Sequence, residues 1–265
     1  MRMRATVVAL CALTLAGGAL LAQGRFRGSF APVDEESLIH NVQYDGRFTF
    51  ARVRYVTGDG GYYYRGLPAW AHGYPRAERD LMQILGEVSD IAPRIEESNV
   101  LAVSDPEFFK YPVAYMTEGG FWMMSDSDAV SLRGWLQKGG FLIMDDFRDG
   151  GFGRGGGGWA QVESNMKRVL PDARWVDLDP SMPVYHSFFE IPSLGIVPQS
   201  YDAGRPIFRG IFEDNDPTKR LMVIANFNTD VSDFWEFSAT GSYPVSESNE
   251  AYKLGVNYVI YGMTH

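Results

Sequence analysis

Short, continuous apolar runs that alternate with helical patterns constrain the fold of this chain more than any other feature. The runs Val100–Val103, Val113–Met116 and Phe141–Met144 are typical of strands buried on both faces of a sheet. Helical patterns separate them, over Pro75–Ser89 and again from Ser125 to Gly139. This order predicts an α/β fold in which a mostly parallel sheet lies between two layers of helices.

Further elements complete the pattern along the chain. Strands are predicted over Phe48–Tyr55, Trp175–Leu178, Ile207–Phe212 and Leu221–Ala225, and helices over Trp159–Leu170 and Glu250–Tyr261. The segment Gly58–Tyr74 is rich in glycine and aromatic residues and is predicted to be a long loop, whereas Asn226–Glu236 is predicted to be a polar turn. Long loops in compact domains often carry function, so we expect the aromatic loop to line a site.

Composition excludes several classes of protein. With 45% hydrophobic and 22% charged residues in 265 positions, the chain is typical of a globular protein with one large domain. Its net charge of −9 makes binding to the phosphate backbone of a nucleic acid unfavourable. We therefore expect no nucleic-acid partner.

The first 22 residues have the pattern of a secretory signal peptide. Arg2 and Arg4 precede the uncharged stretch Ala5–Ala22, which ends in small residues. This predicts a periplasmic or secreted protein, with an N-terminal arm over residues 23–47 and one domain over residues 48–265. The alternative is an uncleaved anchor, which would be the chain's only contact with a membrane.

The single cysteine limits the chemistry that the exported chain can perform. Cys11 lies inside the predicted signal peptide, so the mature domain contains no thiol. A cysteine nucleophile and a thiolate metal site are therefore excluded. No two histidines have the spacing of a zinc hydrolase motif.

Acidic residues follow the predicted buried strands. Asp105, Glu118 and the pair Asp145 and Asp146 each come directly after an apolar run. Because the carboxyl ends of parallel strands meet at one edge of a sheet, we expect these carboxylates to lie there, beside the aromatic loop with Trp70. Such a group favours a divalent cation or a polyol, and the alternative is that these acids cap helices and face solvent.

Two further candidates are weaker. Asp230, Asp233 and Glu236 place acids within a short polar segment, but the spacing does not fit a calcium-binding EF-hand loop, so the choice lies between a cation site and a helix cap. His186 lies in an aromatic segment, where it is either a ligand-binding residue or a histidine satisfied by local packing. We predict no cofactor other than a divalent cation.

An ordered series of short motifs gives the chain a family resemblance. The series runs through Trp70, Tyr74-Pro75-Arg76-Ala77-Glu78, Asp105-Pro106, Tyr111-Pro112, Tyr115-Met116, Leu132-Arg133, Gly139-Gly140-Phe141-Leu142, Asp145-Asp146, Asn228, Asp230 and Trp235-Glu236. In this it resembles the bacterial domain-of-unknown-function family 4159. The chain departs from the family at His72-Gly73, where members commonly carry an aspartate before the tyrosine.

The resemblance implies a fold but no chemistry. It implies a flavodoxin-like α/β sandwich similar to that of class I glutamine amidotransferases, with Asp145 and Asp146 near the position of the catalytic elbow. Cysteine-dependent amidotransferase activity is not implied, because the mature chain contains no cysteine.

Three functions remain open at this point. The first is an exported binding protein that takes a small molecule, a glycan or an envelope protein at the acidic edge, with Trp70, Tyr74, Asp105, Glu118, Asp145, Asp146 and His186 as candidate ligand-binding residues. The second is a hydrolase of envelope glycans or peptides that uses Asp145 or Asp146 as a general base. The third is a structural protein of envelope assembly.

Overall fold

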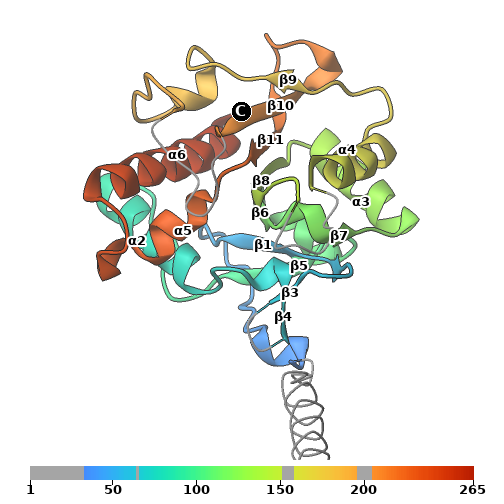
Figure 1. Ribbon diagram of the computed structural model, residues 1–265, viewed down its shortest axis with the longest axis horizontal. Coiled ribbons are helices and arrows are strands. Elements are labelled where there is room, and N and C mark those ends of the chain that lie inside the picture. Colours follow the sequence, from blue (N-terminus) through green and yellow to red (C-terminus); the bar gives the residue numbers. More distant parts are fainter. Residues whose placement is uncertain (1–32, 64–65, 151–157, 196–204) are drawn as a thin grey trace, which may run out of the picture.

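A seven-stranded sheet forms the centre of the protein (Figure 1). The computed structural model describes residues 33–63, 66–150, 158–195 and 205–265, and the predicted signal peptide lies outside them. The order across the sheet is β5, β1, β6, β8, β11, β10 and β9. Their bounds, in chain order, are β1 Ala51–Arg54, β5 Asn99–Ala102, β6 Val113–Thr117, β8 Phe141–Phe147, β9 Val176–Asp177, β10 Ile207–Phe212 and β11 Leu221–Phe227.

The sheet is mostly parallel, as the apolar strands predicted. β5, β1, β6, β8 and β11 run parallel, while β10 runs antiparallel to both of its neighbours. Numbered along the chain, the parallel strands have the order 2-1-3-4-5, which is the doubly wound order of flavodoxin-like sheets. In that order the chain reverses direction across the sheet between β1 and β6, which is the point where doubly wound sheets generally bind ligands at their carboxyl ends.

Helices cover both faces of the sheet and make three layers (Figure 1). One layer contains α2 Arg76–Val88, α5 Val231–Glu236 and α6 Val245–Thr264, and the other contains α3 Asp126–Gln137 and α4 Gly158–Val169. Each face of the sheet has its own apolar core, because the strands have buried side chains on both sides. No described helix has both the length and the apolar character that a membrane crossing requires.

Three expectations about local structure were wrong in detail. The loop before α2 contains a small hairpin, β3 Tyr62–Tyr63 with β4 Leu67–Pro68. β8 does not end before Asp145, because both aspartates have buried partners that let the strand continue to Phe147. The predicted polar turn at 226–236 instead contains the end of β11 and the helix α5.

A second small antiparallel ribbon lies next to the end of β1. It pairs β2 Val56–Thr57 with β7 Trp122–Met123, the latter directly before α3. A capping box closes the start of α3, in which Ser125 and Asp128 exchange hydrogen bonds with each other's backbone.

The segment before β1 is attached to the edge strand β5. The side-chain amide of Asn41 accepts a hydrogen bond from the backbone N–H of Val100 at 2.7 Å and donates one to its carbonyl at 2.8 Å. In return, the side chain of Asn99 bonds both backbone groups of Val42. This segment therefore satisfies edge groups of the sheet through amide side chains.

A buried ion pair connects the sheet to the α2 layer. The side chain of Arg52 on β1 is fully buried and pairs with Glu78 on α2, which is also buried. The guanidinium also donates two hydrogen bonds of 2.9 Å, to the carbonyls of Trp70 and His72. One arginine thus fixes a strand, a helix and the loop between them.

We predict that Glu78→Gln strongly destabilises the fold. The substitution leaves the buried Arg52 charge without its counter-ion, which costs about 3–5 kcal/mol when one partner of a buried pair is removed. Urea unfolding followed by circular dichroism measures this, with the exposed Glu87→Gln on the same helix as the control. A free energy of unfolding equal for both variants would show that the ion pair does not hold this region.

Candidate functional site

Asp145 is the fixed centre of the carboxyl edge of the sheet. Its side chain is fully buried and accepts four hydrogen bonds. One oxygen accepts from the Tyr115 hydroxyl at 2.6 Å and from the backbone N–H groups of Val231 and Ser232 at 3.0 and 3.1 Å, and the other accepts from the Asn226 amide at 3.0 Å. Asp145 therefore joins β6, β8 and β11 to the N-terminus of α5, and its oxygens are committed to that role.

The adjacent residue, Asp146, belongs to a second group that reaches solvent. Its carboxylate is hydrogen bonded to Nδ1 of His72 and accepts from the Thr117 hydroxyl at 3.3 Å. The Glu118 carboxylate lies 3.7 Å from the same His72 nitrogen. His72, Glu118 and Asp146 offer ligand atoms that all lie within 4.8 Å of one another, which is close enough to hold one metal ion. The side chains of His72 and Glu118 are 25% and 17% exposed, so the group is open on one side.

Unusual backbone conformations orient the carboxylates of Glu118 and Asp146. Glu118 and Asp146 have φ of 52° and 53°, in the left-handed region that non-glycine residues rarely adopt. Gly73, at φ +72°, follows His72, and an added Cβ there would lie 3.4 Å from the Glu236 carboxylate. The hydroxyl of Tyr55 supports the turn at Glu118 by donating to the carbonyls of Thr117 and Glu118 at 2.8 and 2.9 Å. Residues in such strained conformations gather at functional sites.

The start of α5 adds two more carboxylates. Asp230 caps this helix, since one of its oxygens accepts from the Asp233 backbone N–H at 2.9 Å and from the Ser232 hydroxyl at 2.8 Å. Its other oxygen is buried and has no hydrogen-bond partner within the described part of the chain. His72, Asp230 and Asp233 form a second group of ligand atoms within 4.8 Å of one another. His72 thus belongs to both groups.

Burial and mutual repulsion favour protonation of these acids. Burial raises the pKa of Glu118 well above its usual value, and the nearby Asp146 adds to the effect. Burial likewise raises the pKa of Asp230, with Asp146 and Asp233 contributing. Although burial lowers the pKa of His72, the Asp146 carboxylate raises it well above the usual value. Burial raises the pKa of Asp145 to about 7, against the opposing hydrogen bonds from Tyr115 and Asn226.

The structure brings some of the predicted site residues together and separates others from them. Glu118, Asp146, Asp230 and Asp233 come together around His72, and Glu236 lies beside them at Gly73. Trp70 is fully buried, and its indole N–H donates to Glu35, so it belongs to the core rather than to an exposed wall.

Three others have local partners. Tyr74 is half-buried next to the Arg52 guanidinium, at 5.9 Å from ring centre to charge. Asp105 caps a short 3₁₀ helix by accepting from the Glu107 backbone N–H. The ring of His186 contacts the Glu190 carboxylate and the Pro180 carbonyl. In the described part of the chain, neither Asp105 nor His186 belongs to either ligand group.

Sequence reasoning missed His72 as a site residue. It lies in the aromatic loop and has no metal-binding spacing to another histidine. A signal was nevertheless present, because Arg52 falls within an apolar strand and a buried arginine needs partners. One of those partners is the His72 carbonyl, so the buried arginine indicates that the loop containing His72 packs against the sheet.

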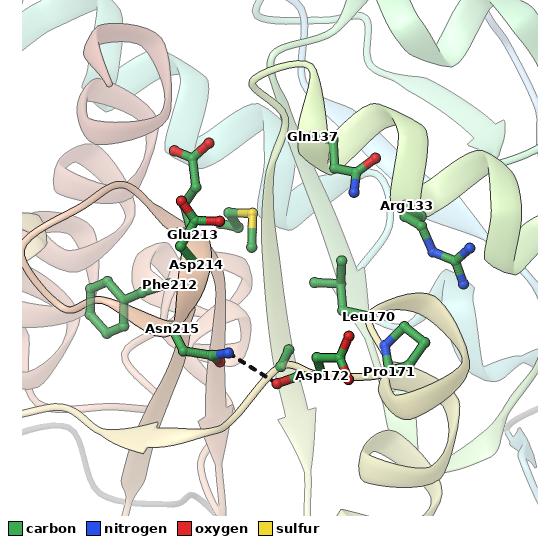
Figure 2. A pocket seen from close by; sticks show the side chains of 11 residues that line it. Arg133, Gln137, Leu170, Pro171, Asp172, Phe212, Glu213, Asp214 and Asn215 are labelled. Carbon is green, nitrogen blue, oxygen red and sulfur yellow. Dashed lines mark hydrogen bonds between the residues drawn. The ribbon is translucent and has the colours of Figure 1, made fainter.

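A pocket of about 520 Å³ lies at the opposite edge of the sheet from the ligand groups (Figure 2). The ends of α3 and α4 and the turn from β10 to β11 form its walls. Several of its polar groups are engaged within the chain: Arg133 donates to the Arg168 and Val169 carbonyls, Asn215 donates to the Asp172 carbonyl, and Asp214 pairs with Lys219. The two groups of ligand atoms around His72 lie at the other edge of the sheet.

Comparison with known proteins agrees with the motif series. The model of the family described as "Domain of unknown function (DUF4159)" matches residues 49–263. The chain belongs to the DUF4159 family. The match covers every strand of the central sheet and each residue of the two ligand groups. No curated protein matches this DUF4159 chain.

We predict that Asp145→Asn destabilises the protein although it changes only one oxygen to an NH₂ group. All four hydrogen bonds are donated to Asp145, so the amide of asparagine would oppose at least one donor in a buried place. We expect a loss of about 2–4 kcal/mol, measured by urea unfolding.

The control is Asp105→Asn, at the cap of the short 3₁₀ helix, for which we expect a loss of about 1 kcal/mol or less. Equal stability of Asp145→Asn and the unmodified chain would contradict the structural role of Asp145.

Proposed function

We propose that this protein binds a divalent cation at the carboxyl edge of its sheet and uses the ion to hold an oxygen-rich ligand. The observation that carries the proposal is the close approach of His72, Glu118 and Asp146, whose ligand atoms lie within 4.8 Å of one another. Glu118 directly follows β6, Asp146 lies near the end of β8, and His72 lies in the loop before α2. The carboxyl ends of such strands are where doubly wound sheets bind ligands.

The unpaired oxygen of Asp230 supports a cation independently of this geometry. A buried carboxylate oxygen without a hydrogen-bond partner is costly, and a positive ion removes that cost. The raised pKa values of Glu118 and Asp230 also favour a bound cation. Carboxylates that repel one another retain protons, and a cation would replace those protons. His72 is hydrogen bonded to the Asp146 carboxylate, so its imidazole already lies within reach of these acids.

The ligand set favours a transition metal over calcium or magnesium. Imidazole nitrogen combined with carboxylate oxygen suits zinc and manganese, whereas calcium and magnesium prefer oxygen alone. The partial exposure of His72 and Glu118 leaves one side of the group open, which is what an external ligand needs.

The site's setting suggests the class of ligand. The signal-peptide pattern over residues 1–22 leads us to propose that the domain works outside the cytoplasm, in the periplasm or as a secreted protein. There the ligand is a small molecule, a glycan or an envelope protein. Fractionation of cells that express the full chain tests this: the export proposal fails if the protein keeps residues 1–22 and stays in the cytoplasm.

We predict that the protein binds Zn²⁺ or Mn²⁺ and that His72→Ala abolishes binding. Isothermal titration calorimetry of the chelator-treated full chain with ZnCl₂ and with MnCl₂ measures it directly. Asp146→Asn should weaken binding about 10-fold or more while keeping the fold, because asparagine tolerates the left-handed conformation at this position.

His186→Ala is the matched control, since His186 also contacts a carboxylate but lies in neither ligand group. Binding that survives His72→Ala, or that His186→Ala removes, would overturn the proposal. Because Asp145 holds the fold, substitutions of Asp146 and His72 are the informative ones.

A second candidate function is hydrolysis. The hydrogen bond from His72 to Asp146 is the arrangement in which a carboxylate orients an imidazole for proton transfer. Turnover of p-nitrophenyl acetate and bis-p-nitrophenyl phosphate that disappears in His72→Ala would support a hydrolase. Metal binding without turnover would support the binding protein. If the protein neither binds a metal ion nor hydrolyses these substrates, envelope assembly becomes the better hypothesis.

A further inference from the structure

A separate pocket of about 420 Å³ lies at the carboxyl ends of β1 and β5. Its walls come from five parts of the chain: the segment before β1, the ends of the two strands, the β2–β7 ribbon, the β3 strand and the first turn of α3. Its volume falls within the range of small-molecule sites. We propose that this pocket binds a sugar-sized, polyhydroxylated ligand.

Tyr55 separates this pocket from the metal-ligand groups. The Tyr55 side chain lines the pocket and is buried, and its hydroxyl points to the carbonyls of Thr117 and Glu118. The two sites therefore flank the point between β1 and β6 where the sheet order reverses. Binding in the pocket needs no metal ion, so this proposal does not rest on the proposed function.

The charges around the pocket are already balanced in part. Arg54 is paired with Glu36 at 2.7 Å and lies 3.9 Å from Glu35, which also lines the pocket. Asp128, which also lines the pocket, is held by the capping box of α3. Because this lining carries no excess of positive charge, it disfavours an anionic ligand. It offers both hydrogen-bond donors and acceptors, which suits hydroxyl groups, since each hydroxyl both donates and accepts.

Thr57 contributes a hydroxyl that lacks a partner. The residue is 7% exposed, and its Oγ1 forms no hydrogen bond with any of the described residues. An unpaired buried hydroxyl costs stability, and a ligand hydroxyl in the pocket would supply the partner.

Aromatic rings provide the apolar part of the site. Trp122 is buried in the wall, whereas Tyr62 is 50% exposed at the rim. An exposed ring beside polar groups is the usual platform for the apolar face of a sugar, because the ring packs against C–H groups while the hydroxyls reach the side chains around it. Ser104 adds a further hydroxyl at the end of β5.

The test is a titration of the full chain with D-glucose and with N-acetyl-D-glucosamine, in the presence of EDTA, followed by saturation-transfer difference NMR. We expect saturable binding of at least one of the two sugars. Thr57→Val should weaken it by about 2- to 10-fold, while Thr57→Ser, which keeps the hydroxyl, should retain it. Tyr62→Ala should weaken it about 10-fold, with Tyr62→Phe as the control that keeps the ring.

Two results would overturn the inference. One is the absence of saturable binding for both sugars at tens of millimolar. The other is binding that is unchanged in both Thr57→Val and Tyr62→Ala, which would place the sugar elsewhere. Because EDTA is present throughout, the outcome does not depend on whether the His72 group binds a metal, and loss of zinc binding in His72→Ala should leave sugar binding intact.

Discussion

The buried Arg52–Glu78 ion pair is the interaction on which the rest of the structure depends. Desolvating a guanidinium is costly, and here a helix carboxylate and two loop carbonyls offset much of that cost. One of those carbonyls belongs to His72. The arginine that attaches α2 to the sheet therefore also fixes the backbone of His72, from the side away from the acids that the histidine faces.

Asp145 plays the corresponding part on the other half of the sheet. It collects donors from β6, β11 and the first turn of α5, so the strand ends and the helix start cannot move independently. Its neighbour Asp146 has a left-handed backbone conformation and is hydrogen bonded to His72 instead. The two consecutive aspartates thus have different partners: Asp145 holds the edge of the sheet together, and Asp146 belongs to the site that we propose there.

Much of this could be predicted from the sequence, and the reasons for the exceptions are physical. Uninterrupted apolar strands imply a covered parallel sheet, and the acids after Met116 and Met144 were rightly placed at one edge because parallel strands end together. What could not be predicted was the role of each acid. Asp145 and Asp146 are neighbours with identical chemistry, and only the donors that tertiary packing brings to each distinguish them. Trp70 seemed to line the site because its loop is aromatic, whereas the Arg52 contact draws that part of the loop into the core.

The ends of the central sheet have a consequence for how copies of this protein behave together. β9 contains only two residues, and Asp177 on it is paired with Arg209. At β5, the amide of Asn41 already occupies the N–H and carbonyl of Val100 that an added strand would use. Short, charged or covered borders resist strand-by-strand growth of a sheet from one molecule into the next. The two borders of the sheet therefore oppose strand pairing between neighbouring copies of the protein.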